Sequence, residues 1–166
     1  MIKSTFVIAS LMLVFGSFAM AQSDEAAVLD NALKTCHATP PADDKEKETP
    51  CLETALDVCV EKEDTAGWGA RCATRAEQLW DKELNKVYKE LQGRLTLKER
   101  NVLISSQRSW IQYRNAEFKL IDSMYSFEKG TMNISFNAHA RKGVVMKRAL
   151  ALKHYLEGYS PDTMAK

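Results

Sequence analysis

The chain has 166 residues, and its 23 Lys and Arg side chains nearly balance its 22 Asp and Glu side chains. A chain of this length supports one domain with a single hydrophobic core. Its basic residues are spread around the predicted helices rather than gathered in a stripe, which argues against a nucleic-acid-binding protein.

Residues 1–21 are predicted to be a secretory signal peptide. Lys3 gives a positive start, residues 6–18 form an apolar run, and Ala19-Met20-Ala21 is a small-x-small cleavage signal. Cleavage after Ala21 leaves 145 residues with no membrane anchor and predicts a periplasmic or secreted protein. The alternative is an uncleaved anchor over residues 2–18.

Charge is distributed unevenly along the rest of the chain. Residues 22–66 carry 12 acidic and 4 basic side chains, whereas residues 67–166 carry 10 acidic and 18 basic ones. We expect the acidic segment to dock on the basic helices of its own chain. The alternative is that it offers an acidic surface to a basic partner.

The first half of the mature chain is predicted to contain two short helices. The first spans residues 23–36 and is followed by a solvated loop, residues 37–50, that contains Pro40-Pro41. The second spans residues 51–63, and Gly67-Trp68-Gly69 is predicted to break the chain after it.

Four cysteines follow the signal, and an even number in an exported chain predicts two disulfides. Cys51 and Cys59 on one helix would lie about 12 Å apart along its axis, beyond the roughly 7 Å that a disulfide spans. We favour Cys36–Cys51 with Cys59–Cys72, because each pair flanks a predicted break. The alternative is Cys36–Cys59 with Cys51–Cys72.

Two long helices are predicted next, over residues 70–91 and 96–128. The second begins at the capping box Thr96-x-x-Glu99, where a side-chain oxygen and a carboxylate accept from backbone N–H groups. Because Gly93 and Thr96 leave only a few residues between the helices, we expect them to be antiparallel neighbours.

The second long helix carries two polar side chains on its apolar face. Gln107 and Arg114 lie one turn on either side of Trp110. A buried guanidinium needs a partner, because an unpaired charge away from water is costly. Glu77 or Asp81, on the preceding helix, is the predicted partner of Arg114.

A last helix is predicted over residues 133–156, followed by a tail over residues 158–166. The predicted fold is all-α: a small disulfide-stapled helical domain built on a long antiparallel helical hairpin plus a C-terminal helix. An N-terminal helix and acidic loop, residues 22–50, precede the helical domain, residues 51–157.

The sequence contains no recognisable catalytic constellation. It has no nucleophile elbow, no glycine-rich phosphate loop and no H-E-x-x-H motif, so we predict no enzyme, metal or cofactor. Glu77 and Asp81 lie one helical turn apart, and ion pairing is expected of them rather than acid–base catalysis. The aromatic residues at helical spacing are expected in the core, the alternative being an interface cluster: Trp80, Tyr88, Trp110 and Tyr113.

One pattern on the two long helices resembles the family of small exported domains named after the lysozyme inhibitor LprI, over about residues 51–157. The resemblance implies an all-helical fold, an extracytoplasmic location, and binding of lysozyme or another cell-wall hydrolase. The alternative is an envelope interaction module in which the motif only locks the hairpin. The motif residues are Trp80, Asp81, Leu84, Asn85 and Tyr88, then Gln107, Arg108, Trp110, Arg114 and Glu117.

The chain departs from the family pattern at three places. Phe118 stands where the family usually has a cysteine, and the partner cysteine would fall near Ala140, so we expect apolar packing instead of a late disulfide. Gln22 stands where a lipoprotein has cysteine. An inhibitor of a basic lysozyme is expected to present an acidic collar, for which residues 22–66 are the candidate, and a finger that enters the cleft. We identify no finger loop in the sequence.

Overall fold

The computed structural model describes residues 24–38 and 51–159. The predicted signal peptide, most of the Pro-containing loop and the end of the tail lie outside the described residues. The described chain is helical and contains no strand, which confirms the all-α prediction. Its elements are α1 (Asp24–Ala38), α2 (Cys51–Glu61), α3 (Ala66–Arg94), α4 (Leu97–Met124), the 3-10 turn η2 (Phe127–Lys129) and α5 (Met132–Gly158).

Local capping residues decide where the two long helices begin. The Thr65 side chain accepts from the backbone N–H of Trp68 at 3.1 Å, so α3 begins at Ala66 and runs through the glycines. The predicted break at Gly67-Trp68-Gly69 is therefore wrong, and the chain turns at residues 62–65 instead. The predicted capping box of Thr96 and Glu99 is present at the start of α4.

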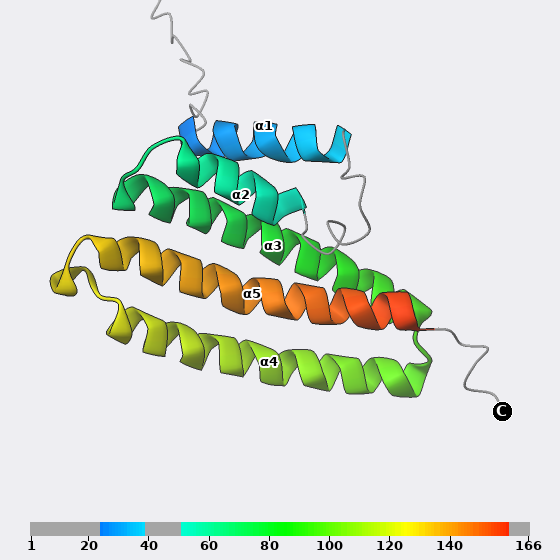
Figure 1. Cartoon of the computed structure of the whole chain (residues 1–166). Helices are drawn as coiled ribbons and strands as arrows, with labels where there is room; N and C mark the ends of the chain where they lie inside the picture. The colour runs from blue at the N-terminus through cyan, green and yellow to red at the C-terminus, as the bar shows by residue number, and fades with distance from the viewer. Residues whose placement is uncertain (1–23, 39–50, 160–166) are drawn as a thin grey trace, which may run out of the picture.

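Figure 1 shows the helices in the spatial order α1, α2, α3, α5, α4. Helices α3 and α4 are consecutive and antiparallel, as predicted for the hairpin. The expectation that they pack directly on each other is wrong, because α5 lies between them, parallel to α3.

Small side chains explain why α5 rather than α4 covers α3. A Cβ atom on Gly69 would lie only 3.1 Å from the Ser135 hydroxyl oxygen, so the two helices approach closely there. Both helices also bury alanines, which permit a close approach, and larger apolar residues. The buried aliphatic residues are Ala70, Ala73, Ala76, Leu84, Val87 and Leu91 on α3, and Ala138, Val145, Ala149, Leu152 and Leu156 on α5.

Helix α4 is the most weakly buried of the long helices. Only Leu103, Gln107 and Ile121 of its 28 residues are buried. The reason is geometric: α5 occupies the face of α3 that α4 would otherwise cover, so α4 packs mainly on the outer side of α5 and reaches α3 near the hairpin turn, where Arg100 donates to the Gln92 carbonyl at 2.9 Å.

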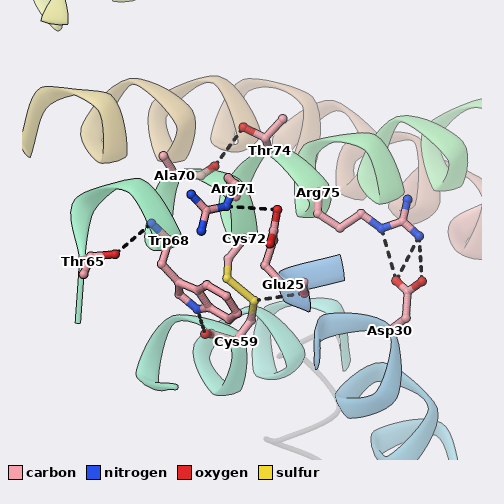
Figure 2. Close-up of a disulfide and its surroundings, with 10 residues drawn as sticks. All are labelled: Glu25, Asp30, Cys59, Thr65, Trp68, Ala70, Arg71, Cys72, Thr74 and Arg75. Carbon is pink, nitrogen blue, oxygen red and sulfur yellow. Dashed lines mark hydrogen bonds and ion pairs between the residues drawn. A yellow bond between two sulfur atoms is a disulfide. The ribbon is translucent and has the colours of Figure 1, made fainter. Parts of the chain in front are cut away.

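Two disulfides fasten α1 and α2 to each other and to α3. Cys36 is bonded to Cys51 and Cys59 to Cys72, with Cα atoms 5.5 Å and 6.0 Å apart, which is the favoured connectivity. Figure 2 shows the second bond beside the indole of Trp68, whose N–H donates to the Cys59 carbonyl at 2.6 Å.

Ion pairs dock α1 on the basic surface of α3. Arg71 lies 3.1 Å from the Glu25 carboxylate, and Arg75 makes a two-pronged contact with Asp30, with its shortest distance at 2.8 Å (Figure 2). These two acids of the acidic segment bind their own chain, in agreement with the first of the two interpretations of the charge asymmetry.

Candidate functional site

The α3 half of the sequence motif belongs largely to the core. Trp80 is 3% exposed and its indole N–H donates to a Glu53 carboxylate oxygen at 2.7 Å. The other oxygen of Glu53 accepts from Lys142, which is itself 7% exposed. This network joins α2, α3 and α5 through the part-buried carboxylate of Glu53, and Leu84 is buried one turn farther along α3.

The polar residues of that half make contacts along their own helix. The Asn85 amide donates to the Asp81 carboxylate at 3.0 Å, and the Tyr88 hydroxyl accepts from Gln92 at 3.1 Å. These contacts support the helix and leave Asn85 exposed.

The α4 half of the motif faces α5. The Gln107 side chain is buried and its oxygen accepts from Arg148 at 3.1 Å. The guanidinium carbons of Arg114 and Arg148 lie 5.3 Å and 6.0 Å from the centroid of the Trp110 ring. The hydrogen-bond partner of Gln107 is thus Arg148 of α5, which the sequence analysis did not identify.

The predicted ion pair of Arg114 with Glu77 or Asp81 is wrong. Arg114 is half-buried against the Trp110 and Phe118 rings, and it donates to the Asn115 side chain at 3.1 Å. Because α5 lies between the two long helices, the carboxylate of Glu77 pairs with Arg141 of α5 instead.

The position where the family pattern expects a cysteine is filled by a stacked pair. The Arg141 guanidinium lies 4.0 Å from the centroid of the Phe118 ring. At this position the structure has a cation–π contact between α4 and α5, and Phe118 also packs against the core.

The α4–α5 interface opens into a groove of about 600 Å³. Glu117 is half-buried in its wall, while Arg108, the remaining motif residue, is exposed on α4. The floor of the groove is formed by small residues of α5, among them Ala140 and Gly143.

The connection between α4 and α5 presents four large apolar side chains to solvent. We call this region the tip, residues 124–136. The exposed fractions are 51% for Met124, 68% for Phe127, 57% for Met132 and 52% for Phe136. The sequence analysis identified no finger loop in this region. The signal that could have indicated one is the aromatic residue Phe127 in a break that ends at Gly130.

Hydrogen bonds to backbone carbonyls brace the tip. Lys129 donates to the carbonyl oxygens of Ser123 and Met124 at 2.8 and 3.2 Å, and Asn133 donates to that of Lys129 at 2.9 Å. Gly130 has a φ of 119°, a conformation that L side chains rarely adopt. The turn is thus specified by its own residues.

Beside the tip lies a second hollow of about 600 Å³ that contains two carboxylates. We call it the acidic pocket. Asp122 accepts from Asn137 and Arg141, each at 3.0 Å, and the hydrogen bond from Asn137 is the largest cause that lowers its pKa. The carboxylate of Glu77 is 3.8 Å from Arg141.

The two carboxyl groups are shifted in opposite directions. Burial raises the pKa of Glu77 above its ordinary value of 4.5, and the nearby charge of Asp81 raises it further. The cations Arg141 and Arg114 oppose this effect without cancelling it. The pKa of Glu77 is therefore raised overall, with burial as the largest cause.

Within residues 24–38 and 51–159, no group of three or more His, Cys, Asp or Glu side chains is arranged to hold a metal ion. In the same ranges, no helix has the length and apolar character needed to span a membrane.

Comparison with known proteins identifies a family. The family model described as lysozyme inhibitor LprI matches residues 59–152, which include the motif, the tip and the acidic pocket. No curated protein matches the chain. No solved structure matches it.

Proposed function

Because the chain belongs to the LprI lysozyme inhibitor family, we propose that it is an exported protein that binds and inhibits a lysozyme or a related cell-wall hydrolase. The family match over residues 59–152 is the observation that carries this proposal. The activity is binding, and no catalytic step by this chain is involved.

Export is the second part of the proposal. Two disulfides are typical of proteins that fold in an oxidising compartment, and every described cysteine is bonded. A signal peptide over residues 1–21, cleaved after Ala21, delivers the chain to the periplasm or the medium. The helical domain of residues 51–157 then acts there as the binding unit.

A second candidate function is supported by the motif itself. Trp80 and Gln107 bond to Glu53 and Arg148 of their own chain, so these motif residues hold helices together. An envelope interaction module with a different partner would use the same internal contacts. Under both candidate functions, the partner-binding surface must be formed by other, exposed residues.

A cell-wall lysis assay tests the proposal. Purified, oxidised mature protein is titrated into a suspension of bacterial cell walls with a common-type animal lysozyme, and the lysis rate is expected to fall to a saturating minimum. The matched control is the same protein reduced and alkylated, which should lose inhibition because α1 and α2 are no longer fastened to α3. Unchanged lysis at a large molar excess of oxidised protein refutes lysozyme inhibition and leaves the envelope module.

A further inference from the structure

We propose that the tip is the surface that contacts the hydrolase, with Phe127 packed against apolar surface of the partner and a basic side chain of the partner in the acidic pocket. This inference rests on the proposed function, and it names the binding surface and the chemistry of the partner.

The first step is the exposure of Phe127. An aromatic ring that is 68% exposed keeps most of its apolar surface in water, and covering it by a partner is favourable. Aromatic residues are enriched among the few interface residues that carry most of the binding energy. Met124, Met132 and Phe136 surround the same turn and are about half exposed, so the apolar surface extends beyond a single side chain.

The second step is the set of contacts that brace the turn presenting the ring. Lys129 and Asn133 tie the turn to backbone carbonyls, and Tyr125 packs on Phe136 with ring centroids 6.1 Å apart. A surface that is already ordered loses little conformational entropy when a partner binds. The contacts that brace the tip therefore favour its entry into a concave site.

The third step is the charge of the adjoining pocket. Glu77 and Asp122 contribute two carboxylates, and among the described residues that line the pocket Arg141 is the one cation. Asp122 is bonded by Asn137 and Arg141, whereas the one described ion pair of Glu77 is the long contact of 3.8 Å to Arg141. A lysine or arginine of the partner would supply the charge that Glu77 lacks.

The fourth step is that the two features form one surface. Phe127 and Tyr125 line the acidic pocket as well as belonging to the tip, so a partner that covers the ring also covers the mouth of the pocket. Lysozymes of the common animal type are basic, and an acidic pocket beside an apolar anchor is complementary to a surface of that kind. The partner chemistry is therefore a basic side chain next to apolar surface.

Two variants and one matched control test the inference. Phe127→Ala removes the anchor, Glu77→Gln removes one charge while keeping the shape, and Leu97→Ala removes a side chain that is 75% exposed at the opposite end of α4. Each mature, oxidised protein is titrated calorimetrically with common-type lysozyme. Thermal unfolding of each variant provides a readout of folding that is independent of binding.

We expect Phe127→Ala to weaken binding at least about tenfold and Leu97→Ala to change it less than about twofold. Glu77→Gln should also weaken binding, and raised salt should reduce the difference between it and wild type because the contact is electrostatic.

The failures are distinguishable. Wild-type binding that survives both Phe127→Ala and Glu77→Gln in folded proteins overturns the inference and leaves the proposed function standing. Absence of binding and of inhibition by the wild type overturns the proposed function and the inference with it. A dimer of the free protein that Phe127→Ala dissociates assigns the tip to self-association and also overturns the inference.

Discussion

Replacing Lys142 by methionine should strongly destabilise the fold, because it breaks the buried network between α2, α3 and α5. The Lys142 side chain is 9% exposed and that of Glu53 is 22% exposed. Methionine keeps most of the volume of the lysine stem, so the change mainly removes the positive charge. It leaves the Glu53 carboxylate with the indole N–H of Trp80 as its one remaining bond in this network.

The magnitude follows from the burial of both groups. Breaking a buried ion pair by removing one partner costs about 3–5 kcal/mol, because the other charge stays desolvated. Partial contact of Glu53 with water reduces this penalty, and we expect the free energy of unfolding to fall by about 2–4 kcal/mol. Lys142→Met combined with Glu53→Gln should recover most of the loss, since an amide oxygen still accepts from Trp80 and no charge is left unpaired.

Urea unfolding of the oxidised proteins, followed by tryptophan fluorescence and by circular dichroism, measures both effects as a double-mutant cycle. The expected coupling free energy between the two positions is above about 1 kcal/mol. A Lys142→Met protein within about 0.5 kcal/mol of wild type, or a double variant whose loss equals the sum of the single losses, would refute the argument.

Three further predictions concern other parts of the fold. Removing the buried disulfide by Cys59→Ala with Cys72→Ala should lower the free energy of unfolding by about 3 kcal/mol in chemical denaturation, since the bond closes a loop over a sequence separation of 13. Gly143→Ala should raise the melting temperature and increase the free energy of unfolding by about 0.5–1 kcal/mol. The reason is that the added methyl group would meet no atom within 4 Å and alanine favours the helix. A lower melting temperature would contradict this prediction. The Glu77→Gln variant should be more stable than wild type at pH 7. When unfolding is measured as a function of pH, the difference in stability between the two proteins should vanish below 4.5, the ordinary pKa of a glutamate. The sign follows because burial raises the folded-state pKa of Glu77, so its contribution to stability is lost as the pH rises through that pKa; a constant difference would contradict it.

Much of the helical architecture was predictable because its signals are local. The capping box at Thr96 and Glu99 depends on residues three positions apart, and it marks the start of α4 in the sequence and in the structure. The apolar stripe of α3 predicts which of its residues are buried, as Trp80 and Leu84 illustrate. The start of α3 was missed because two glycines were taken as a break, whereas the local signal that decides it is the cap at Thr65.

The candidate site was less predictable, because its contacts join residues that are far apart in the chain. Gln107 was identified as an unusual polar residue on an apolar face, but its partner Arg148 lies 41 positions away. The partner of Arg114 was predicted wrongly because the choice of Glu77 or Asp81 assumed that α3 and α4 pack on each other along their length. The exposure of Phe127 depends on the direction in which α5 leaves the turn. No periodic pattern in the sequence predicts that direction.

The sequence by itself determined the helices, the faces that they bury and membership of the LprI family, because periodicity, capping and the spacing of motif residues are properties of neighbouring positions. Only the tertiary structure decided that α5 lies between α3 and α4, that Lys142 is buried on Glu53, and that an exposed apolar turn adjoins an acidic pocket. The physical reason is that an apolar helix face must be buried against another element, but the face itself does not determine which element that is. That choice depends on how closely small residues let two helices approach.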